Sequence, residues 1–315
     1  MDVFKSINKI PEMNETVLTI GSFDGLHRGH QEVIRKVVTT SNTINVPSVV
    51  ITFDPHPKMI LSENINFEIL MNLDHKIALL DNYGIDALII IPFNIKFSTT
   101  TATKFLESVI IEKFNPSRII IGYDHHFGYK RKGDSKFLES KATQYGYITE
   151  VVSEVGDEGE IYSSSRIRKL IKEGNVRRAS YDLGRAYGFE VMIVSGSGRG
   201  NDLNFPTANF IPRFESQLIP FSGVYFTRGL IGGNWLYGMA NLGIRPTFNE
   251  KGFVMEMNFF DANLDKFYGE IFEIQFLERI RDEKKFNSSD DLIKQLKKDK
   301  SYCLKRIEVY KEEKQ

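Results

Sequence analysis

Two histidines stand three residues apart in a glycine-rich segment of this sequence. The segment covers residues 21–30 and reads Gly-Ser-Phe-Asp-Gly-Leu-His-Arg-Gly-His, so the histidines are His27 and His30. An apolar, β-branched run precedes it, and a helical apolar spacing follows it. Glycines let backbone N–H groups approach an anion, and a helix N-terminus adds positive potential. The segment is therefore a candidate polyphosphate site, with both imidazoles on one side of the helix start.

Two other interpretations stay open at this point. A glycine-rich turn with surface histidines would have the same pattern, and a histidine pair could also hold a metal ion. A metal site normally needs further ligands, and no carboxylate or cysteine has an obvious partner spacing.

Three further segments place polar residues beside expected strands or helices. They read Phe-Asp-Pro-His-Pro at 53–57, Ile-Gly-Tyr-Asp-His-His-Phe-Gly at 121–128 and Ser-Ser-Ser-Arg-Ile-Arg at 163–168. Ser164 and Ser165 precede a helical run, where they could cap the helix and contact an anion. Arg168 offers a planar fork for phosphate. Asp124 follows a buried-type strand, where its carboxylate could meet a ribose, a base or a flavin. The structural alternatives are a helix cap, a solvated helix face and a turn aspartate.

Taken together, the four segments resemble the signature of the HxGH nucleotidylyltransferases. More narrowly, they resemble the prokaryotic bifunctional FAD synthetases, which are riboflavin kinase/FMN adenylyltransferases. The resemblance implies that FMN and ATP react to give FAD and pyrophosphate, with His27 and His30 as catalytic residues and Mg²⁺ on the leaving pyrophosphate. It implies a flavin or nucleotide contact for Asp124. The ATP-binding residues that it implies are Gly21, Ser22, Phe23, Asp24, His27, His30, Ser164, Ser165 and Arg168.

A second glycine-rich segment occupies residues 196–209 and ends in Phe-Pro-Thr-Ala-Asn. Thr207 and Asn209 offer oxygens that suit a hard cation and its phosphates, although a purely structural turn fits the pattern equally well. The segment resembles the riboflavin-kinase signature. That resemblance implies that Gly198, Thr207 and Asn209 bind ATP with Mg²⁺, the metal being held by Thr207 and Asn209. It further implies that Glu256 is the general base for the ribityl hydroxyl and that Arg281 binds flavin.

Several positions depart from the family pattern. Asn201, Asn204, Val191 and Asn258 replace residues that are usual in the kinase half, and His125 replaces an aromatic residue in the first half. These departures leave two other functions open. One is a monofunctional FMN adenylyltransferase with a weakened or inactive kinase domain, and the other is a flavin-binding regulatory protein.

The elements that must position these residues change in kind along the chain. Expected strands at 16–20, 47–53, 87–91, 118–121 and 147–152 alternate with helices, which predicts a Rossmann-like parallel α/β domain over 1–183. The expected helices are at 73–83, 101–113 and 133–145, and another opens near His30. Short strands at 190–194, 224–227, 235–241, 254–259 and 271–277 predict a small antiparallel β-barrel. A terminal helix at 288–311, with Asp290 as N-cap, completes a second domain over 184–315.

Composition limits the remaining choices. The 315 residues carry 41 Lys+Arg and 41 Asp+Glu, so no basic excess points to nucleic acid. No apolar run approaches the roughly 20 residues that span a bilayer, which predicts no membrane partner. Cys303 is the single cysteine, so an internal disulfide is excluded and a reducing cytoplasm is expected. The expected partners are the small-molecule substrates ATP, riboflavin and FMN; the sequence indicates no oligomeric state.

Overall fold

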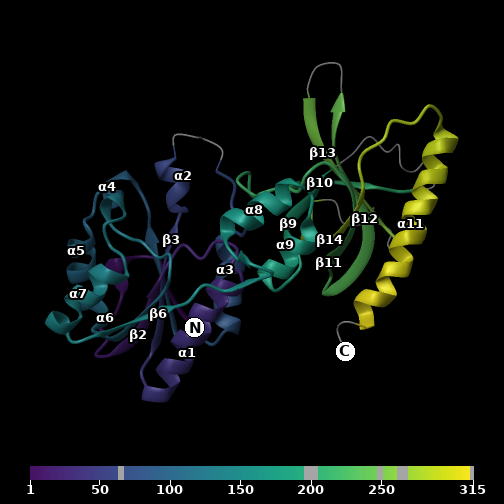
Figure 1. Ribbon diagram of the computed structural model, residues 1–315. Coiled ribbons are helices and arrows are strands. Elements are labelled where there is room, and N and C mark those ends of the chain that lie inside the picture. Colours follow the sequence, from purple (N-terminus) through teal and green to yellow (C-terminus); the bar gives the residue numbers. More distant parts are fainter. Residues whose placement is uncertain (63–66, 195–204, 247–250, 261–268, 313–315) are drawn as a thin grey trace. The chain divides into compact units, whose positions relative to one another are not determined.

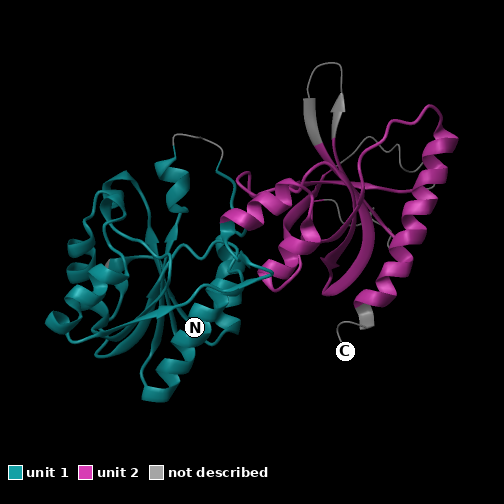
Figure 2. Ribbon diagram, in the orientation of Figure 1, with its two compact units in different colours: residues 1–164 teal, residues 165–315 magenta. Residues whose placement is uncertain are grey.

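The computed structural model describes the chain except for residues 63–66, 195–204, 247–250, 261–268 and 313–315. The chain divides into two compact units, residues 1–164 and residues 165–315 (Figure 2). Each unit has its own sheet and its own buried cores, and each is described by itself below.

Unit 1 is built on a six-stranded parallel sheet (Figure 1). The spatial order is β1-β4-β3-β2-β5-β6, and every neighbouring pair runs parallel. The strands are β1 (Asp2–Phe4), β2 (Thr16–Ile20), β3 (Ser48–Asp54), β4 (Ala87–Pro92), β5 (Pro116–Gly122) and β6 (Ile148–Val152). Central strands β2 and β3 are buried on both faces, which explains their continuous apolar runs. The predicted Rossmann-like parallel α/β domain is confirmed.

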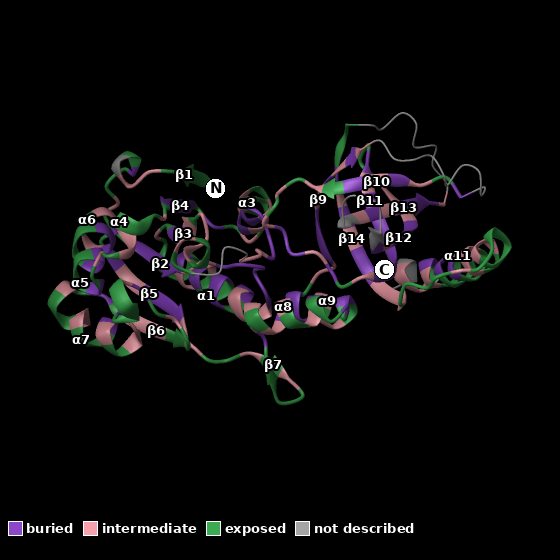
Figure 3. Ribbon diagram, turned by 90° about the horizontal axis from the view of Figure 1, so that it is seen from above, coloured by how far each residue is buried: buried purple, intermediate pink, exposed green. Residues whose placement is uncertain are grey.

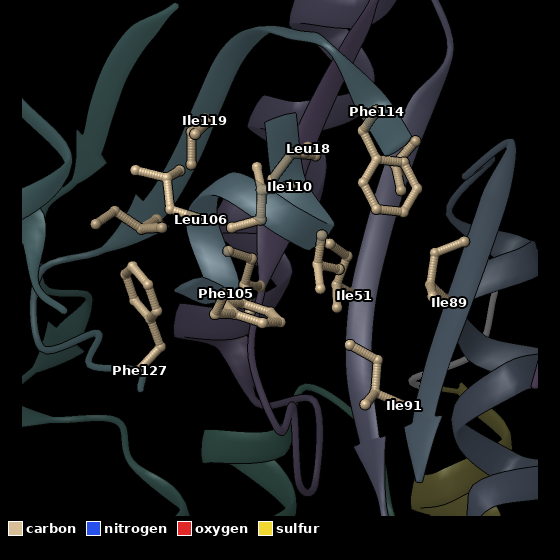
Figure 4. Close-up of a cluster of buried hydrophobic side chains, with 14 of the residues drawn as sticks. Leu18, Ile51, Ile89, Ile91, Phe105, Leu106, Ile110, Phe114, Ile119 and Phe127 are labelled. Carbon is tan, nitrogen blue, oxygen red and sulfur yellow. The ribbon is translucent and has the colours of Figure 1, made fainter. Parts of the chain in front are cut away.

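Helices cover both faces of this sheet. They are α1 (Arg28–Ile44), α2 (Pro57–Leu61), α3 (Leu73–Asn82), α4 (Ile95–Ser98), α5 (Ala102–Phe105), α6 (Glu112–Phe114) and α7 (Ser135–Tyr145). Two buried clusters result, because alternate strand residues point to opposite faces. Val17 belongs to the cluster that includes residues of α1 and α3, whereas its neighbour Leu18 belongs to the cluster that includes residues of α5 and α7. Figure 4 shows the second cluster, with Leu18 and Phe105 of α5 labelled.

Several local features differ from expectation. The edge strand β1 (Asp2–Phe4) was not expected; it is short and pairs with one neighbour, β4. The helix expected over 101–113 contains a π-helical stretch at Leu106–Ile111 between α5 and α6. The first helix begins at Arg28 rather than near His30, because His27 acts as its N-cap. Unit 1 also holds a small hairpin, β7 (Gly156–Asp157) with β8 (Glu160–Ile161).

Unit 2 contains a closed antiparallel barrel of order β10-β13-β12-β11-β14-β9. Its strands are β9 (Tyr187–Val194), β10 (Ala208–Pro212), β11 (Gly223–Ile231), β12 (Asn234–Pro246), β13 (Lys251–Phe259) and β14 (Ile271–Arg281). Buried positions dominate the described parts of these strands (Figure 3). The predicted small β-barrel is therefore confirmed. Strand β10 was not expected, because it is short and follows a glycine-rich segment.

Within the described residues of this part of the chain, the helices are α8 (Ser164–Lys172), α9 (Val176–Leu183) and α11 (Ser289–Glu312). Apart from Ser164, α8 belongs to unit 2, where the backbone N–H of Phe221 donates to the carbonyl of Ile171. The terminal helix is confirmed, but the expected N-cap is wrong. Asp290 lies inside the first turn, and the hydroxyl of Ser288 accepts the N–H of Asp291.

Candidate active sites

The loop between β2 and α1 is shaped by rings that fill the space beside its glycines. A Cβ on Gly21 would lie 2.9 Å from the ring of Phe23, and one on Gly29 would lie 3.2 Å from the ring of His27. Phe23 itself has a φ of 47°, in the left-handed region that non-glycine residues rarely adopt. The loop is thus a specific, sterically determined turn at the carboxyl end of β2, which is where ligands bind in parallel α/β sheets.

His27 and His30 are brought together as the spacing predicted. Their rings stack with centroids 3.7 Å apart and 23° between the planes. The Nδ1 atom of His27 also accepts the backbone N–H of His30 at 3.4 Å, which places His27 at the helix N-terminus. Burial, the neighbouring His27 and the charge of Lys76 hold the pKa of His30 well below its usual range. Among the described residues, the buried Nδ1 of His30 has no hydrogen-bond partner.

Asp24 and Ser164 hold this loop in place. The buried carboxylate of Asp24 accepts the backbone N–H of Leu70 at 3.1 Å and 3.2 Å. The hydroxyl of Ser164 donates to the backbone carbonyl of Asp24 at 2.8 Å. The hydrogen bond from Ser164 therefore connects the segment at 163–168 with the segment at 21–30. The carboxylate of Asp24 binds the protein backbone at Leu70.

Lys76 is a buried residue of this region that sequence reasoning missed. It lies on α3 with 6% of its surface exposed, and its Nζ donates to the backbone carbonyl of Ser22 at 2.7 Å. Its position in an amphipathic helix gives no sequence signal, because an outward lysine would follow the same pattern.

Asp124 lies just beyond β5, whose neighbour in the sheet is β2. Its side chain is exposed, and its contact with a flavin or nucleotide stays a prediction. The following His125 ring stacks on Phe127 at 5.8 Å. Burial, followed by the charges of His126 and Arg131, lowers the pKa of His125 to about 4.

Ser165 and Arg168, the remaining predicted ATP-binding residues, belong to unit 2. Ser165 is exposed in the first turn of α8, and Arg168 is partly exposed on the same helix. The apolar face of α8 buries Ile167 and Ile171, which leaves these two polar residues on other faces.

A polar row crosses three adjacent strands of the barrel. Asn209 on β10 pairs with Glu256 on β13, which pairs in turn with Asn241 on β12. Directly paired residues share a face, so these three side chains project to the same side. Their sequence neighbours Ala240 and Met257 are fully buried and point to the other face.

The polar row lies on the outer face of the barrel. Met239 precedes Asn241 by two positions and packs in one cluster with Cys303 and Ile307 of α11. The polar row therefore lies on the same face of the barrel as the residues that pack against α11. The amide of Asn241 donates to the carboxylate of Glu283 at 3.4 Å, which adds a second acidic group beside the row.

Thr207 is partly exposed immediately before β10, two residues from Asn209. The buried side chain of Asn258 donates to the carbonyl of Pro206 at 2.7 Å and so fixes the backbone before Thr207. This contact gives the departure at position 258 a structural role. Gly198, together with Asn201 and Asn204, lies outside the described residues.

Arg281 has protein partners on every side-chain nitrogen. Its Nε and Nη2 contact the carboxylate of Asp299 at 3.0 Å and 2.7 Å, and its Nη1 donates to the carbonyl of Asp282. Asp299 belongs to α11, so this pair fastens the helix to β14. The flavin contact of Arg281 stays a prediction.

No cluster of three or more metal-ligating His, Cys, Asp or Glu side chains occurs within the described part of the chain. The oxygens of Thr207 and Asn209 are of a type that suits a hard cation. In the same described residues, no helix has the length and apolar character needed to cross a membrane.

Comparisons with known proteins match both units. A family model described as FAD synthetase matches residues 9–166, and one described as riboflavin kinase matches residues 183–307. The chain is 33% identical to the bifunctional riboflavin kinase/FMN adenylyltransferase of Haemophilus influenzae, covering 90% of this chain and 91% of that protein. It is 31% identical to the Bacillus subtilis protein of the same name, covering 93% of each. A crystal structure described as a macrolide-efflux protein from Streptococcus pneumoniae matches with a TM-score of 0.86 and 32% identity, covering 95% of this chain and 97% of that one.

The parallel α/β unit, the closed barrel unit and the two family models that match them define a nucleotide-using transferase with two activities. The chain belongs to the family of bifunctional riboflavin kinase/FMN adenylyltransferases. Its activities convert riboflavin to FMN and FMN to FAD, both at the expense of ATP.

Proposed function

We propose that the loop at residues 21–30 is the centre of adenylyl transfer. The FMN phosphate attacks the α-phosphorus of ATP directly, so the enzyme needs no nucleophile of its own. Catalysis then rests on positioning and on stabilising negative charge. The stacked pair His27 and His30 at the N-terminus of α1 is the observation that carries this proposal.

The family resemblance assigns further residues of both units to ATP. Backbone groups of Gly21, Ser22, Phe23 and Asp24 line the turn, and Ser164, Ser165 and Arg168 bind phosphate from the start of α8. The exposed carboxylate of Asp124, beyond the adjacent strand, contacts the flavin or nucleotide.

For the kinase we propose that Glu256 is the general base. It accepts the proton of the ribityl hydroxyl while that oxygen attacks the γ-phosphorus of ATP, whose bond to the bridging oxygen breaks to release ADP. Thr207 and Asn209, with Gly198 of the preceding segment, hold ATP. The pairing of Asn209 with Glu256 on neighbouring strands supports this assignment, because it puts the base beside the phosphate ligands.

Mg²⁺ fits the oxygens of Thr207 and Asn209. When bound, it would neutralise phosphate charge and orient the transferred group.

Arg281, held against Asp299, is proposed to border the flavin site. We further propose domains over 1–183 and 184–315 for the two activities, with a reducing cytoplasm as their compartment.

Two substitutions test the division of labour. His30→Ala should lower FAD formation from FMN by about 10²–10³-fold and leave riboflavin phosphorylation within twofold of wild type.

Glu256→Gln should lower FMN formation by about 10²–10⁴-fold and leave FAD formation from added FMN unchanged. Chromatography of flavin products separates the two steps. Loss of both activities in either variant would contradict separate sites, and wild-type protein that makes FAD but no FMN would establish the monofunctional alternative.

A further inference from the structure

Lys76 has an unusual environment for a lysine. Its side chain is almost fully buried, and its hydrogen-bond partners in the described part of the chain are neutral oxygens. Lysine is rarely buried without a paired carboxylate, because a charge removed from water is costly. Burial lowers the pKa of Lys76, and the more distant charges of Asp24 and Asp54 oppose that effect.

The ammonium group fixes one carbonyl of the adenylyl-transfer loop. Nζ donates to the carbonyl of Ser22 at 2.7 Å and lies 3.4 Å from Oγ1 of Thr52. The hydroxyl of Thr52 also reaches the Ser22 carbonyl, at 3.3 Å. Helix α3 and strand β3 therefore meet at this carbonyl. Because the peptide plane joins Ser22 to Phe23, the same contact sets the direction of the Phe23 N–H in its left-handed turn.

Lys76 and two helix N-termini bring positive potential to this loop, and the carboxylates of Asp24 and Asp54 act against it at Lys76. Lys76 lies in the first turn of α3 (Leu73–Asn82), where the helix dipole disfavours a cation. Its charge also acts on His30, which itself lies in the first turn of α1. A buried ammonium and a helix dipole that repel one another are unfavourable in the free protein. A bound polyanion would relieve this repulsion.

We propose that Lys76 is a positioning residue for adenylyl transfer, which holds the Ser22 carbonyl and supplies a fixed positive charge to the loop that binds the ATP phosphates. The proposal rests on the assignment of residues 21–30 to ATP. It separates two contributions of one side chain, a hydrogen bond that shapes the turn and a charge that attracts phosphate.

Three variants separate these contributions. Lys76→Met removes both the hydrogen bond and the charge, and Lys76→Gln retains a donor without the charge. Thr52→Val is the matched control, because it removes a neutral group from the same carbonyl and leaves the ammonium in place. Each full-length variant is assayed for FAD formation from FMN, for riboflavin phosphorylation in the same preparation, and for inhibition by inorganic pyrophosphate.

We expect Lys76→Met to lower kcat/KM for ATP in FAD formation by about 30–100-fold, with kinase activity within twofold of wild type. The pyrophosphate inhibition constant should rise about tenfold in Lys76→Met and Lys76→Gln alike and stay within twofold in Thr52→Val. If Lys76→Met does not fold, Lys76→Gln carries the same test.

Two results would overturn the proposal. One is a Lys76→Met or Lys76→Gln enzyme with FAD formation within threefold of wild type. The other is reduced FAD formation with wild-type pyrophosphate inhibition, which would reduce Lys76 to a structural residue. Wild-type protein that forms no FAD from FMN would instead refute the proposed function of the loop.

Discussion

At the scale of single residues, two glycines of the loop at residues 21–30 are explained by the rings that pack beside them. Gly21 leaves room for Phe23, and Gly29 leaves room for His27. Phe23 in turn meets His30 edge-to-face at 5.3 Å. Small and large residues in this segment therefore form one packed unit around the stacked histidines. A segment that sequence alone allows to be a flexible glycine-rich turn is instead a pre-shaped one, as a phosphate site requires.

The buried imidazole of His125 predicts a pH-dependent stability. Its folded-state pKa of about 4 lies below the ordinary value of 6.5. As pH falls through 6.5, the unfolded chain binds a proton that the folded chain does not, so stability is lost until about pH 4. His125→Phe, which restores an aromatic ring, removes this loss. Between pH 7.5 and pH 4.5, the free energy of unfolding of the wild-type protein should therefore fall by about 2 kcal/mol more than that of the His125→Phe variant.

Urea unfolding followed by circular dichroism at the two pH values measures this difference. The same constant difference between the two proteins at both pH values would show that His125 titrates normally in the folded chain.

At the scale of elements, Gly188 allows strands β9 and β14 of the barrel to approach closely. A Cβ on Gly188 would lie 2.3 Å from the backbone carbonyl of Ile274 on the opposing strand. Backbone cannot move aside as a flexible side chain can, so Gly188→Ala should destabilise the barrel by about 2–4 kcal/mol. Gly233→Ala, in a β11–β12 turn with open space around it, should cost about 1 kcal/mol.

Fluorescence of Trp235, the single tryptophan, reports barrel unfolding in urea. Equal shifts of the unfolding midpoint in the two glycine variants would mean that the strands separate to accept the methyl group at position 188.

Elements with strong apolar patterns were predictable from the sequence. Strand β2 matches its expected range, since a fully buried parallel strand reads as a continuous β-branched run. Strand β10 was missed because a five-residue strand after a glycine-rich segment has no clear period, yet it carries Asn209. Residues that act through tertiary contacts had no local signal. Lys76 reads as an ordinary helix lysine, and the partner of Arg281 lies 18 residues away on α11.

At the scale of the whole molecule, the chain holds separate hydrophobic cores for its two activities. The clusters on the two faces of the parallel sheet draw only on residues of unit 1, and the cluster under α11 draws only on residues of unit 2. A core defect in one unit should therefore act first on the activity located there.

Phe114→Ala tests this separation in the intact chain. Phe114 is fully buried in unit 1, so its truncation should cost about 3–5 kcal/mol there. In flavin-free protein, the variant should lose FAD formation at a lower urea concentration than wild type does. The urea midpoint of Trp235 fluorescence and the urea concentration at which riboflavin phosphorylation is lost should both equal those of wild type. Gly188→Ala should instead lower the urea midpoints of Trp235 fluorescence and of riboflavin phosphorylation. If Phe114→Ala moves both transitions by the same amount, the two units unfold as one cooperative structure and each activity depends on both cores.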